Sequence, residues 1–260
     1  MSTFLFDKII FGPVKSRRLG VSLGINLLPE TRKVCNFNCI YCECGWTKSD
    51  QFDVSQFPTR MQVYEALDKK LSEMKESNQH PDVITYAGNG EPTLHPEFPG
   101  IIDDSILLRN KYFPEAKITV LSNSTAISDP EIKAALLKAD MNILKLDSAF
   151  DLTVKRHNQP AGNLKVDELI DKLSGFNGKL IIQTLFLRGV YDGNAIDNTS
   201  PEELAAWLKA LARIKPEEVM IYTISRDTPE GGVLSKVPLK ELNDIATMVR
   251  KLGIRSRVSG

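Results

Sequence analysis

The segment Val34-Cys-Asn-Phe-Asn-Cys-Ile-Tyr-Cys-Glu-Cys-Gly45 holds all four cysteines of this 260-residue chain. Cys35, Cys39 and Cys42 have the spacing C-x3-C-x2-C, and Cys44 follows two residues later. Thiolates this close together on one loop can bind one metal centre. A cubane iron–sulfur cluster has four irons, each of which takes a thiolate. Three cysteine ligands would therefore leave one iron open to a substrate or cofactor.

Two other uses of the cysteines remain open from the residues alone. A structural zinc site could use all four thiolates, but zinc ligands usually come as two pairs separated by a longer span. A sealed cluster could use Cys44 as its fourth ligand, since residues two apart in an extended segment face the same way. Against this, in two-cluster ferredoxins the fourth cysteine of a tight run binds the other cluster. The spacing favours an open cluster held by Cys35, Cys39 and Cys42.

The overall composition gives little support for nucleic-acid or membrane binding. Lysine plus arginine equals aspartate plus glutamate, at 33 each, so the formal net charge is zero. This removes a bulk charge argument for nucleic-acid binding, although a local basic patch stays open. Residues 1–8 lack the long apolar run typical of a signal peptide, and no run of about 18 apolar residues predicts a membrane span. Clustered cysteines without a secretory signal favour metal over disulfides, and we expect a cytoplasmic protein.

Strand and helix patterns alternate along the chain without a linker, which predicts one domain over residues 1–260 with a cysteine loop at 33–46. The expected strands are Gly20–Leu27, Val83–Ala87, Lys117–Leu121, Asn142–Leu146, Lys179–Leu187, Glu218–Thr223 and Ile254–Val258. The expected helices are Thr59–Ser77, His95–Asn110, Asp129–Lys138, Val166–Ser174, Pro201–Arg213 and Pro238–Leu252. About six strand–helix units predict an α/β fold with a parallel sheet, either doubly wound or a full or partial (β/α) barrel. In either fold, ligand sites gather at the carboxyl ends of the strands.

A glycine-rich turn, Tyr86-Ala-Gly-Asn-Gly-Glu-Pro-Thr-Leu-His95, follows one of these strands. Gly88 and Gly90 would let backbone approach a ligand closely, and Glu91 could accept a hydrogen bond from an ammonium group. Such a turn alone is weak support for a site, but beside the cysteine motif it becomes much stronger. His95 could be a ligand, although a histidine in this position is more often a cap or a surface residue.

Polar residues also follow or interrupt the later strands. Ser122 and Asn123 could bind a ribose or carboxylate, or simply cap a helix. Lys145 and Asp147 suit a polar ligand or form an ion pair. Gln183 lies within an apolar strand, where its side chain must find a partner.

Basic residues near the cysteines and after a late strand are candidate substrate contacts. Arg17 and Arg18, with Lys15 nearby, could touch phosphate, and the pair Arg32 and Lys33 adds positive charge. These groups could equally neutralise an anionic cluster or be solvated. Arg226 could hold an anionic group or be solvated. The same alternatives apply to Asn198, which could be only the approach to a helix cap.

Taken together, the cysteine spacing, an aromatic residue before the last cysteine and Gly-Asn-Gly-Glu-Pro after the next strand resemble the radical S-adenosylmethionine (SAM) enzymes. The resemblance covers most of the chain, because the strand–helix series also fits their partial (β/α)6 barrel. The stretch Gly-Pro-Val-x-Ser-Arg-Arg-Leu-Gly-x-Ser-Leu-Gly-Ile-Asn before the cysteines looks like a branch of small iron–sulfur oxidoreductases. That branch is similar to the core of the wyosine-type tRNA-modifying enzymes.

The resemblance implies a [4Fe-4S] cluster on Cys35, Cys39 and Cys42, with SAM chelating the fourth iron. It further implies SAM contacts from Tyr41 near the adenine, from Gly88, Asn89, Gly90 and Glu91 at the methionine amino group, and from Ser122, Asn123, Asp147 and Gln183 nearby. Reductive cleavage of SAM would give a 5′-deoxyadenosyl radical that abstracts hydrogen from substrate. The electron would come from a donor such as flavodoxin or ferredoxin.

The resemblance leaves the substrate open. A nucleoside or RNA is the first hypothesis, with Arg17, Arg18, Asn198 and Arg226 as candidate contacts. The alternatives are activation of a glycyl-radical partner protein or, in another class, a non-catalytic iron–sulfur or zinc module. Too few cysteines remain for a second cluster, which argues against sulfur insertion and against the exact wyosine reaction.

Overall fold

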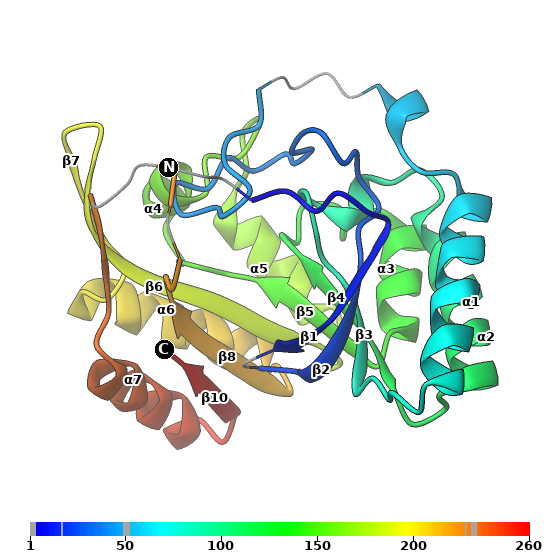
Figure 1. Cartoon of the computed structure of the whole chain (residues 1–260). Helices are drawn as coiled ribbons and strands as arrows, with labels where there is room; N and C mark the ends of the chain where they lie inside the picture. Colours follow the sequence, from blue (N-terminus) through cyan, green and yellow to red (C-terminus); the bar gives the residue numbers. More distant parts are fainter. Residues whose placement is uncertain (1–3, 17, 49–52, 227, 230–232) are drawn as a thin grey trace.

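The computed structural model describes residues 4–16, 18–48, 53–226, 228–229 and 233–260 as an open α/β half-barrel (Figure 1). Its sheet runs in the order β1-β2-β3-β4-β5-β6-β8-β10, with β7 and β9 both paired to β6. The strands are β1 (Ile10–Ser16), β2 (Gly20–Ile25), β3 (Val83–Tyr86), β4 (Lys117–Ser122), β5 (Met141–Lys145), β6 (Ile181–Tyr191), β7 (Asn194–Asp197), β8 (Glu218–Thr223), β9 (Leu234–Lys236) and β10 (Arg255–Ser259).

Seven helices connect these strands within the described residues. They are α1 (Arg60–Glu76), α2 (Phe98–Tyr112), α3 (Pro130–Lys138), α4 (Asp151–His157), α5 (Val166–Ser174), α6 (Pro201–Ile214) and α7 (Leu239–Lys251). Local signals set their starts: Thr59 and Gln62 form a capping box at α1, and the Ser200 side chain accepts from Glu203 N at α6. Figure 1 shows the helices on the outside of the curved sheet.

The strands β2, β3, β4, β5, β6, β8 and β10 are all parallel, while β1 is antiparallel to β2. Because β1 and β10 end the order without pairing to each other, the barrel stays open. The predicted α/β fold with a partial barrel of parallel strands is therefore confirmed. The carboxyl ends of the strands and the loop that carries the cysteines meet at the same end of the barrel (Figure 1).

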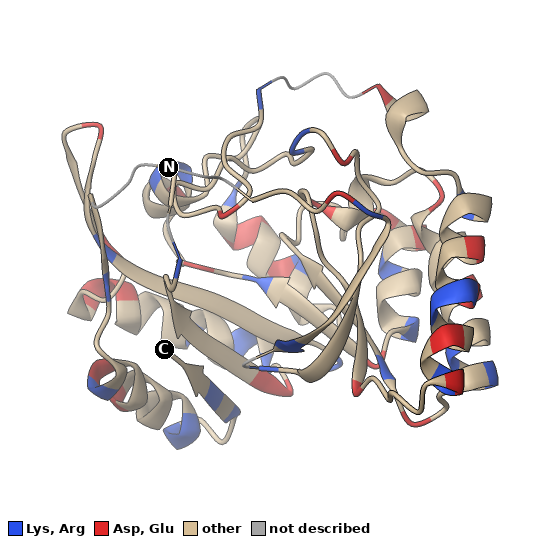
Figure 2. Cartoon of the chain, viewed as in Figure 1, with Lys and Arg blue, Asp and Glu red and all other residues tan. Residues whose placement is uncertain are grey.

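Two apolar layers hold this arrangement together. The larger core lies between the sheet and the helices and includes Leu67, Tyr86 and Trp207, all nearly fully buried. A smaller cluster of Ile143, Ile181 and Met220, with Leu19, Leu121 and Met141 packed against it, fills the inside of the barrel. Charged side chains are concentrated on the outer helices, whereas the strands are mostly free of them (Figure 2). No described helix has the length and apolar character needed to cross a membrane.

The predicted elements all occur, with ends shifted by a few residues. The sequence patterns did not predict β1, α4 or the antiparallel strands β7 and β9. The largest difference is β6, which runs to Tyr191 and not to Leu187, because its far end pairs with β7 and β9 after leaving the barrel. This extension is visible as a projecting hairpin in Figure 1.

Candidate active site

The two motifs singled out in the sequence are joined by backbone hydrogen bonds. Val34 N donates to Asn89 O at 2.8 Å, and Glu91 N donates to Val34 O at 3.0 Å. Gly90 has φ +142°, and a Cβ on it would lie 1.7 Å from the Val34 carbonyl oxygen. Glycine is therefore required where the cysteine loop meets the turn after β3.

A second segment, after α4, supports the loop from the opposite side. Asn38 N donates to Asn158 O at 2.9 Å, and Ile40 N donates to His157 O at 3.0 Å. The Asn158 side-chain amide also lies 3.4 Å from the Cys39 sulfur and donates to it. The sequence reasoning missed Asn158, because no strand end or motif marks its position.

The thiols of the triplet lie in different surroundings. Burial raises the pKa of Cys35 to about 12 and also raises that of Cys39. A hydrogen bond from Cys44, with help from Lys33, lowers the pKa of Cys42 to about 5 despite burial. Asn123 Nδ2 lies 3.7 Å from the Cys35 sulfur.

Lys33 places a buried cation beside these thiols. The residue is 5% exposed, and its Nζ donates to Gly45 O at 2.9 Å. Burial opposes its charge, but Cys42, Cys35 and Cys39 raise the pKa of Lys33 overall. A buried ammonium next to three thiols suits a site in which those thiols become thiolates.

Cys44 faces the glycine turn. Its Sγ donates to Gly88 O at 3.3 Å, and its hydrogen bond with Cys42, followed by burial, raises its pKa. Cys44 thus joins the loop to the turn where the triplet and the turn meet.

Tyr41 belongs to a buried network centred on Asp147. Asp147 Oδ2 accepts from the Tyr41 hydroxyl and, at 2.7 Å, from Asn158 Nδ2, while Oδ1 accepts from Leu185 N at 2.9 Å. Lys145 Nζ lies 3.5 Å from the same carboxylate. Burial, then Asp147, raises the pKa of Tyr41 well above its usual value. The polar atoms of Tyr41 and Asp147 are therefore engaged with protein groups.

Asn89 and Glu91 are also engaged internally. The Asn89 side chain donates to Phe6 O and Pro29 O and accepts from Phe6 N, which ties the N-terminal segment to the turn. The Glu91 carboxylate accepts from the backbone of Thr93 and, at 2.6 Å, from Asn123 N, and burial raises its pKa. Both side chains hold the turn in place.

Ser122 and Asn123 stabilise the turn after β4. The Ser122 hydroxyl accepts from Ser124 N at 3.1 Å, and Asn123 Nδ2 donates to Asn36 Oδ1 at 2.6 Å. Gln183 pairs in register with Lys145 inside the barrel. Among the residues that the structure describes, the Gln183 side-chain amide has no hydrogen-bond partner in the protein.

The candidate substrate contacts are spread apart. Arg17 lies outside the described residues. Arg18 is inside the barrel, with its Cζ 4.6 Å from the Tyr222 ring centroid. Asn198 is 2% exposed. Its side-chain amide donates to Asp147 O, after β5, and to Leu185 O of β6, and its side-chain oxygen accepts from Leu187 N.

Arg226 is an exposed residue and pairs with Glu43 of the cysteine loop at 2.6 Å. His95 is a buried structural residue: its Nε2 donates to Pro58 O at 2.7 Å, and its Nδ1 accepts from Glu97 N. Of the two alternatives expected for His95, a cap or a surface residue, the cap is confirmed, because His95 ends the short 3₁₀ helix Pro92–Leu94 and its local partners allow the ring to be buried.

The donor set fits a cubane cluster better than a single ion. Within the described part of the chain, no three His, Cys, Asp or Glu side chains converge as a single bound metal would need. A cubane places each thiolate on a different iron, so its ligands surround a volume and do not meet at a point. The triplet supplies three such ligands from one loop, and the amide donors at two sulfurs and the Lys33 cation suit their thiolate form.

Comparison with protein families identifies the chain. The model of the radical SAM superfamily matches residues 30–197, which include the cysteine loop, the glycine turn and strands β3 to β7. The chain belongs to the radical SAM superfamily. It is therefore an enzyme of a family that uses SAM in radical chemistry with an iron–sulfur cluster.

Curated relatives of this radical SAM protein have uninformative or unrelated names. A protein named GTPase Obg from Brachyspira hyodysenteriae is 32% identical over 247 residues, which cover 92% of this chain and 32% of that protein. The UPF0026 protein MJ1312 of Methanocaldococcus jannaschii is 29% identical, over 70% of this chain and 55% of its own. A UPF0026 protein of Helicobacter pylori J99 is 29% identical, over 84% of this chain and 67% of that protein.

The chain thus spans about a third of the length of the first of these relatives and about half of the second. The phosphate-binding motif G-x-x-x-x-G-K-[ST] does not occur in it. The name GTPase therefore gives no activity to this chain.

Solved structures share the fold at low sequence identity. A radical SAM methyltransferase from Sphaerobacter thermophilus has a TM-score of 0.66 at 13% identity, covering 92% of this chain and 65% of that one. TYW1 with a bound lysine-pyruvate adduct has a TM-score of 0.57 at 13% identity, with coverage of 88% and 73%. A domain of pyruvate-formate lyase-activating enzyme from Bacteroides vulgatus has a TM-score of 0.50 at 15% identity, with coverage of 68% and 98%.

Proposed function

We propose that this radical SAM enzyme holds a [4Fe-4S] cluster on Cys35, Cys39 and Cys42 and binds SAM between the cysteine loop and the turn Gly88 to Glu91. The observation that carries this is the backbone pairing of the loop with the turn through Val34 and Gly90. When bound, the cluster and SAM supply a 5′-deoxyadenosyl radical, which removes a hydrogen atom from the substrate.

The residues of the chain prepare the site in three ways. Lys33 offsets the negative charge of the thiolates, and the amides of Asn123 and Asn158 donate toward two of the sulfurs. Hydrogen bonds to cluster sulfurs raise the reduction potential, which favours electron uptake. Asn89 and Glu91 keep the turn rigid, so that its backbone can receive the methionine part of SAM.

Deeper in the barrel, the proposed contacts divide into groups that position others and groups that face the ligand. Asp147 holds Tyr41 in place, and Ser122 and Asn123 shape the turn after β4. The Gln183 amide, which has no protein partner among the described residues, can hydrogen-bond to bound SAM. A closed ring of internal hydrogen bonds around Asp147 keeps this part of the site dry.

The test is SAM cleavage by the anaerobically reconstituted protein. With dithionite and SAM, we expect 5′-deoxyadenosine to form, as measured by liquid chromatography, and not to form with Cys42→Ala. A fully loaded wild-type cluster that yields none would overturn the proposal. Replacing dithionite by reduced flavodoxin or ferredoxin then tests the expected electron donor.

For the substrate, we propose a nucleoside or RNA first, supported by the branch resemblance and by the fold shared with TYW1. Activation of a glycyl-radical protein is the second candidate, supported by the fold shared with the activating-enzyme domain. Adding RNA or a glycyl-radical partner to the cleavage assay separates them, because the true substrate should increase 5′-deoxyadenosine formation.

A further inference from the structure

A cavity of about 730 Å³ adjoins the proposed cofactor site. Its walls include Ser22 and Gly24 of β2 and Thr85 of β3, and Ala87 and Glu43 connect it to the glycine turn and the cysteine loop. This volume is in the range of small-molecule sites. A ligand in the cavity would therefore lie directly beside the groups proposed to bind SAM.

Aromatic rings close the cavity on its β1 side. Phe4, Phe6 and Phe11 line it, and the rings of Phe6 and Phe11 stack with centroids 3.6 Å apart. The Phe11 ring lies against Gly24, where a Cβ would come within 2.1 Å of it. Phe11 is thus packed between Phe6 and Gly24, and the three phenylalanines give this wall of the cavity an apolar character.

The charge in the cavity is mainly positive. Lys15, Arg18 and Arg226 line it, against the single acidic residue Glu43, which Arg226 pairs with at 2.6 Å. Within the described part of the chain, Lys15 and Arg18 make no ion pair. Among the residues that the structure describes, no carboxylate therefore offsets the charges of Lys15 and Arg18.

Arg18 is the best positioned of these cations. Its guanidinium stacks on Tyr222, and its carbonyl accepts from Arg257 Nη1 at 2.6 Å. Its Nη1 is buried and has no hydrogen-bond partner in the described part of the chain. A buried, charged N–H without an acceptor is costly, so an acceptor from a ligand would be strongly favoured.

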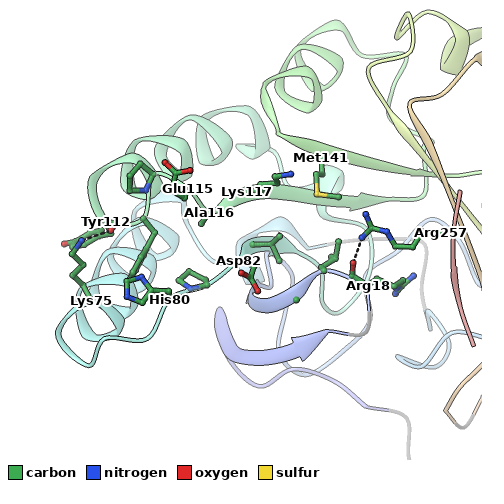
Figure 3. A pocket seen from close by; sticks show the side chains of 16 residues that line it. Arg18, Lys75, His80, Asp82, Tyr112, Glu115, Ala116, Lys117, Met141 and Arg257 are labelled. Carbon is green, nitrogen blue, oxygen red and sulfur yellow. Dashed lines mark hydrogen bonds between the residues drawn. The ribbon is translucent and has the colours of Figure 1, made fainter. Parts of the chain in front are cut away.

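Arg18 also separates this cavity from a second one of about 700 Å³ at the opposite end of the barrel. Arg18 and Leu19 line both cavities. In Figure 3, Arg18 and Arg257 lie at one end of the second cavity, away from Lys75, His80 and Tyr112. Arg18 is thus at the floor of the cavity that adjoins the cofactor site.

Lys145 adds a second cation near the same aromatic ring. Its Nζ donates to the Tyr222 hydroxyl at 3.3 Å. Burial opposes its charge, but Asp147 and Tyr222 raise its pKa, so the side chain stays protonated. Both cations contact the Tyr222 ring, but the Asp147 carboxylate lies 3.5 Å from Lys145 Nζ and offsets its charge, which leaves Arg18 to attract an anion.

We propose that Arg18 binds an anionic group of the substrate, a carboxylate or a phosphate, while an apolar part of the same molecule contacts the phenylalanine side chains that line the cavity. This assignment rests on the proposed function and specifies its substrate class. A guanidinium suits both anions because its N–H groups match their paired oxygens.

Isothermal titration of the cluster-loaded protein tests this with four probes: inorganic phosphate, benzoate, guanosine 5′-monophosphate and guanosine. Guanine is used because adenine would compete for the proposed SAM site. We expect at least one of the anions to bind and guanosine to bind weakly or not at all. Comparing the affinity for benzoate with the affinities for inorganic phosphate and guanosine 5′-monophosphate shows whether the site prefers a carboxylate or a phosphate.

Variants locate the binding. Arg18→Gln should lower the affinity for the anion that binds by about tenfold or more. Lys15→Gln removes an equal charge from the same cavity and should change the affinity within about fivefold. If Arg18→Gln does not fold, Arg18→Lys and Tyr222→Leu replace it in the titration, and both should lower the affinity for the anion.

The inference would be overturned if no anion binds, or if Arg18→Gln and Lys15→Gln lose the same amount of affinity for the anion. The outcome is independent of SAM cleavage. Anion binding without 5′-deoxyadenosine formation would contradict the proposed function, whereas 5′-deoxyadenosine formation without anion binding would contradict only the role of Arg18.

Discussion

The fourth cysteine is the residue whose role the structure changes most. Cys44 is next to Cys42, and its thiol donates to Gly88 O. A thiol that shares its one proton between Cys42 and this carbonyl can hold the loop against the turn without binding iron. We therefore expect Cys44→Ala to keep its cluster and Cys42→Ala to lose it, measured as iron and acid-labile sulfide per chain after reconstitution.

Cys35→Ala and Cys39→Ala are the matched controls and should behave as Cys42→Ala does. Equal losses in Cys42→Ala and Cys44→Ala would mean that Cys44 is a ligand and that the cluster is sealed by four thiolates.

His157 is a buried residue that should make folding pH-dependent. Burial lowers its pKa from 6.5 to about 4. Above pH 6.5 the side chain is neutral in both states and has no effect. Between pH 6.5 and about 4 the unfolded chain binds a proton that the folded chain does not, so the free energy of unfolding falls as pH falls, by up to about 3 kcal/mol.

Urea unfolding of the wild type and His157→Leu at pH 7.5 and 4.5 measures this. The variant should lose less stability than the wild type on acidification, while the same comparison for His80→Asn, at an exposed position, should show no difference. An identical pH dependence in wild type and His157→Leu would contradict the expectation.

At the scale of elements, the joint between the cysteine loop and the turn after β3 depends on one glycine. Gly90→Ala places a methyl group 1.7 Å from Val34 O, and the backbone bonds that flank it must break or move. Gly162 provides the matched control, because its φ is +90° and a Cβ added there would have no atom within 4 Å. Gly90→Ala should cost about 1–3 kcal/mol more than Gly162→Ala.

Chemical unfolding gives these free energies, and cluster content gives a second readout. Gly90→Ala should also lower iron binding, because the loop would no longer be held at the turn. Equal free energies of unfolding and equal iron content in the two variants would contradict the expectation that the contact between Gly90 and Val34 requires glycine.

At the scale of the whole molecule, the N-terminal segment closes one side of the barrel mouth. Phe6 is bound through its backbone to the Asn89 side chain, and Phe4 N donates to Glu43 O. Deleting residues 1–8 removes no strand of the sheet. We expect the truncated chain to keep its far-ultraviolet circular dichroism, to unfold at a lower temperature and to bind more of the dye ANS.

The point variant Asn89→Ala is the control for this truncation, since it removes the same attachment without shortening the chain. It should lower the unfolding temperature as well. An unchanged unfolding temperature after truncation would mean that the segment is not part of the folded unit.

Much of the fold follows from local patterns that need no tertiary context. Apolar periodicity located α1, whose start was predicted at Thr59 and lies at Arg60, and the start of α6 at Pro201 was predicted correctly. The strands β4 and β8 were predicted to within one residue, because buried parallel strands are short apolar runs. By contrast, β1 and β7 were missed, since an edge strand and a projecting hairpin have no such run.

The sequence by itself determined the family, the cysteine triplet and the glycine turn, because these depend on residue type and close spacing. Only the tertiary structure decided which polar groups are free. Asn89, Asp147 and Asn198 have the same residue types as ligand contacts, but each is occupied by partners from distant segments. Arg18 Nη1, by contrast, has no partner among the residues that the structure describes. A hydrogen bond between residues far apart in the chain exists only after folding, so no local pattern could distinguish them.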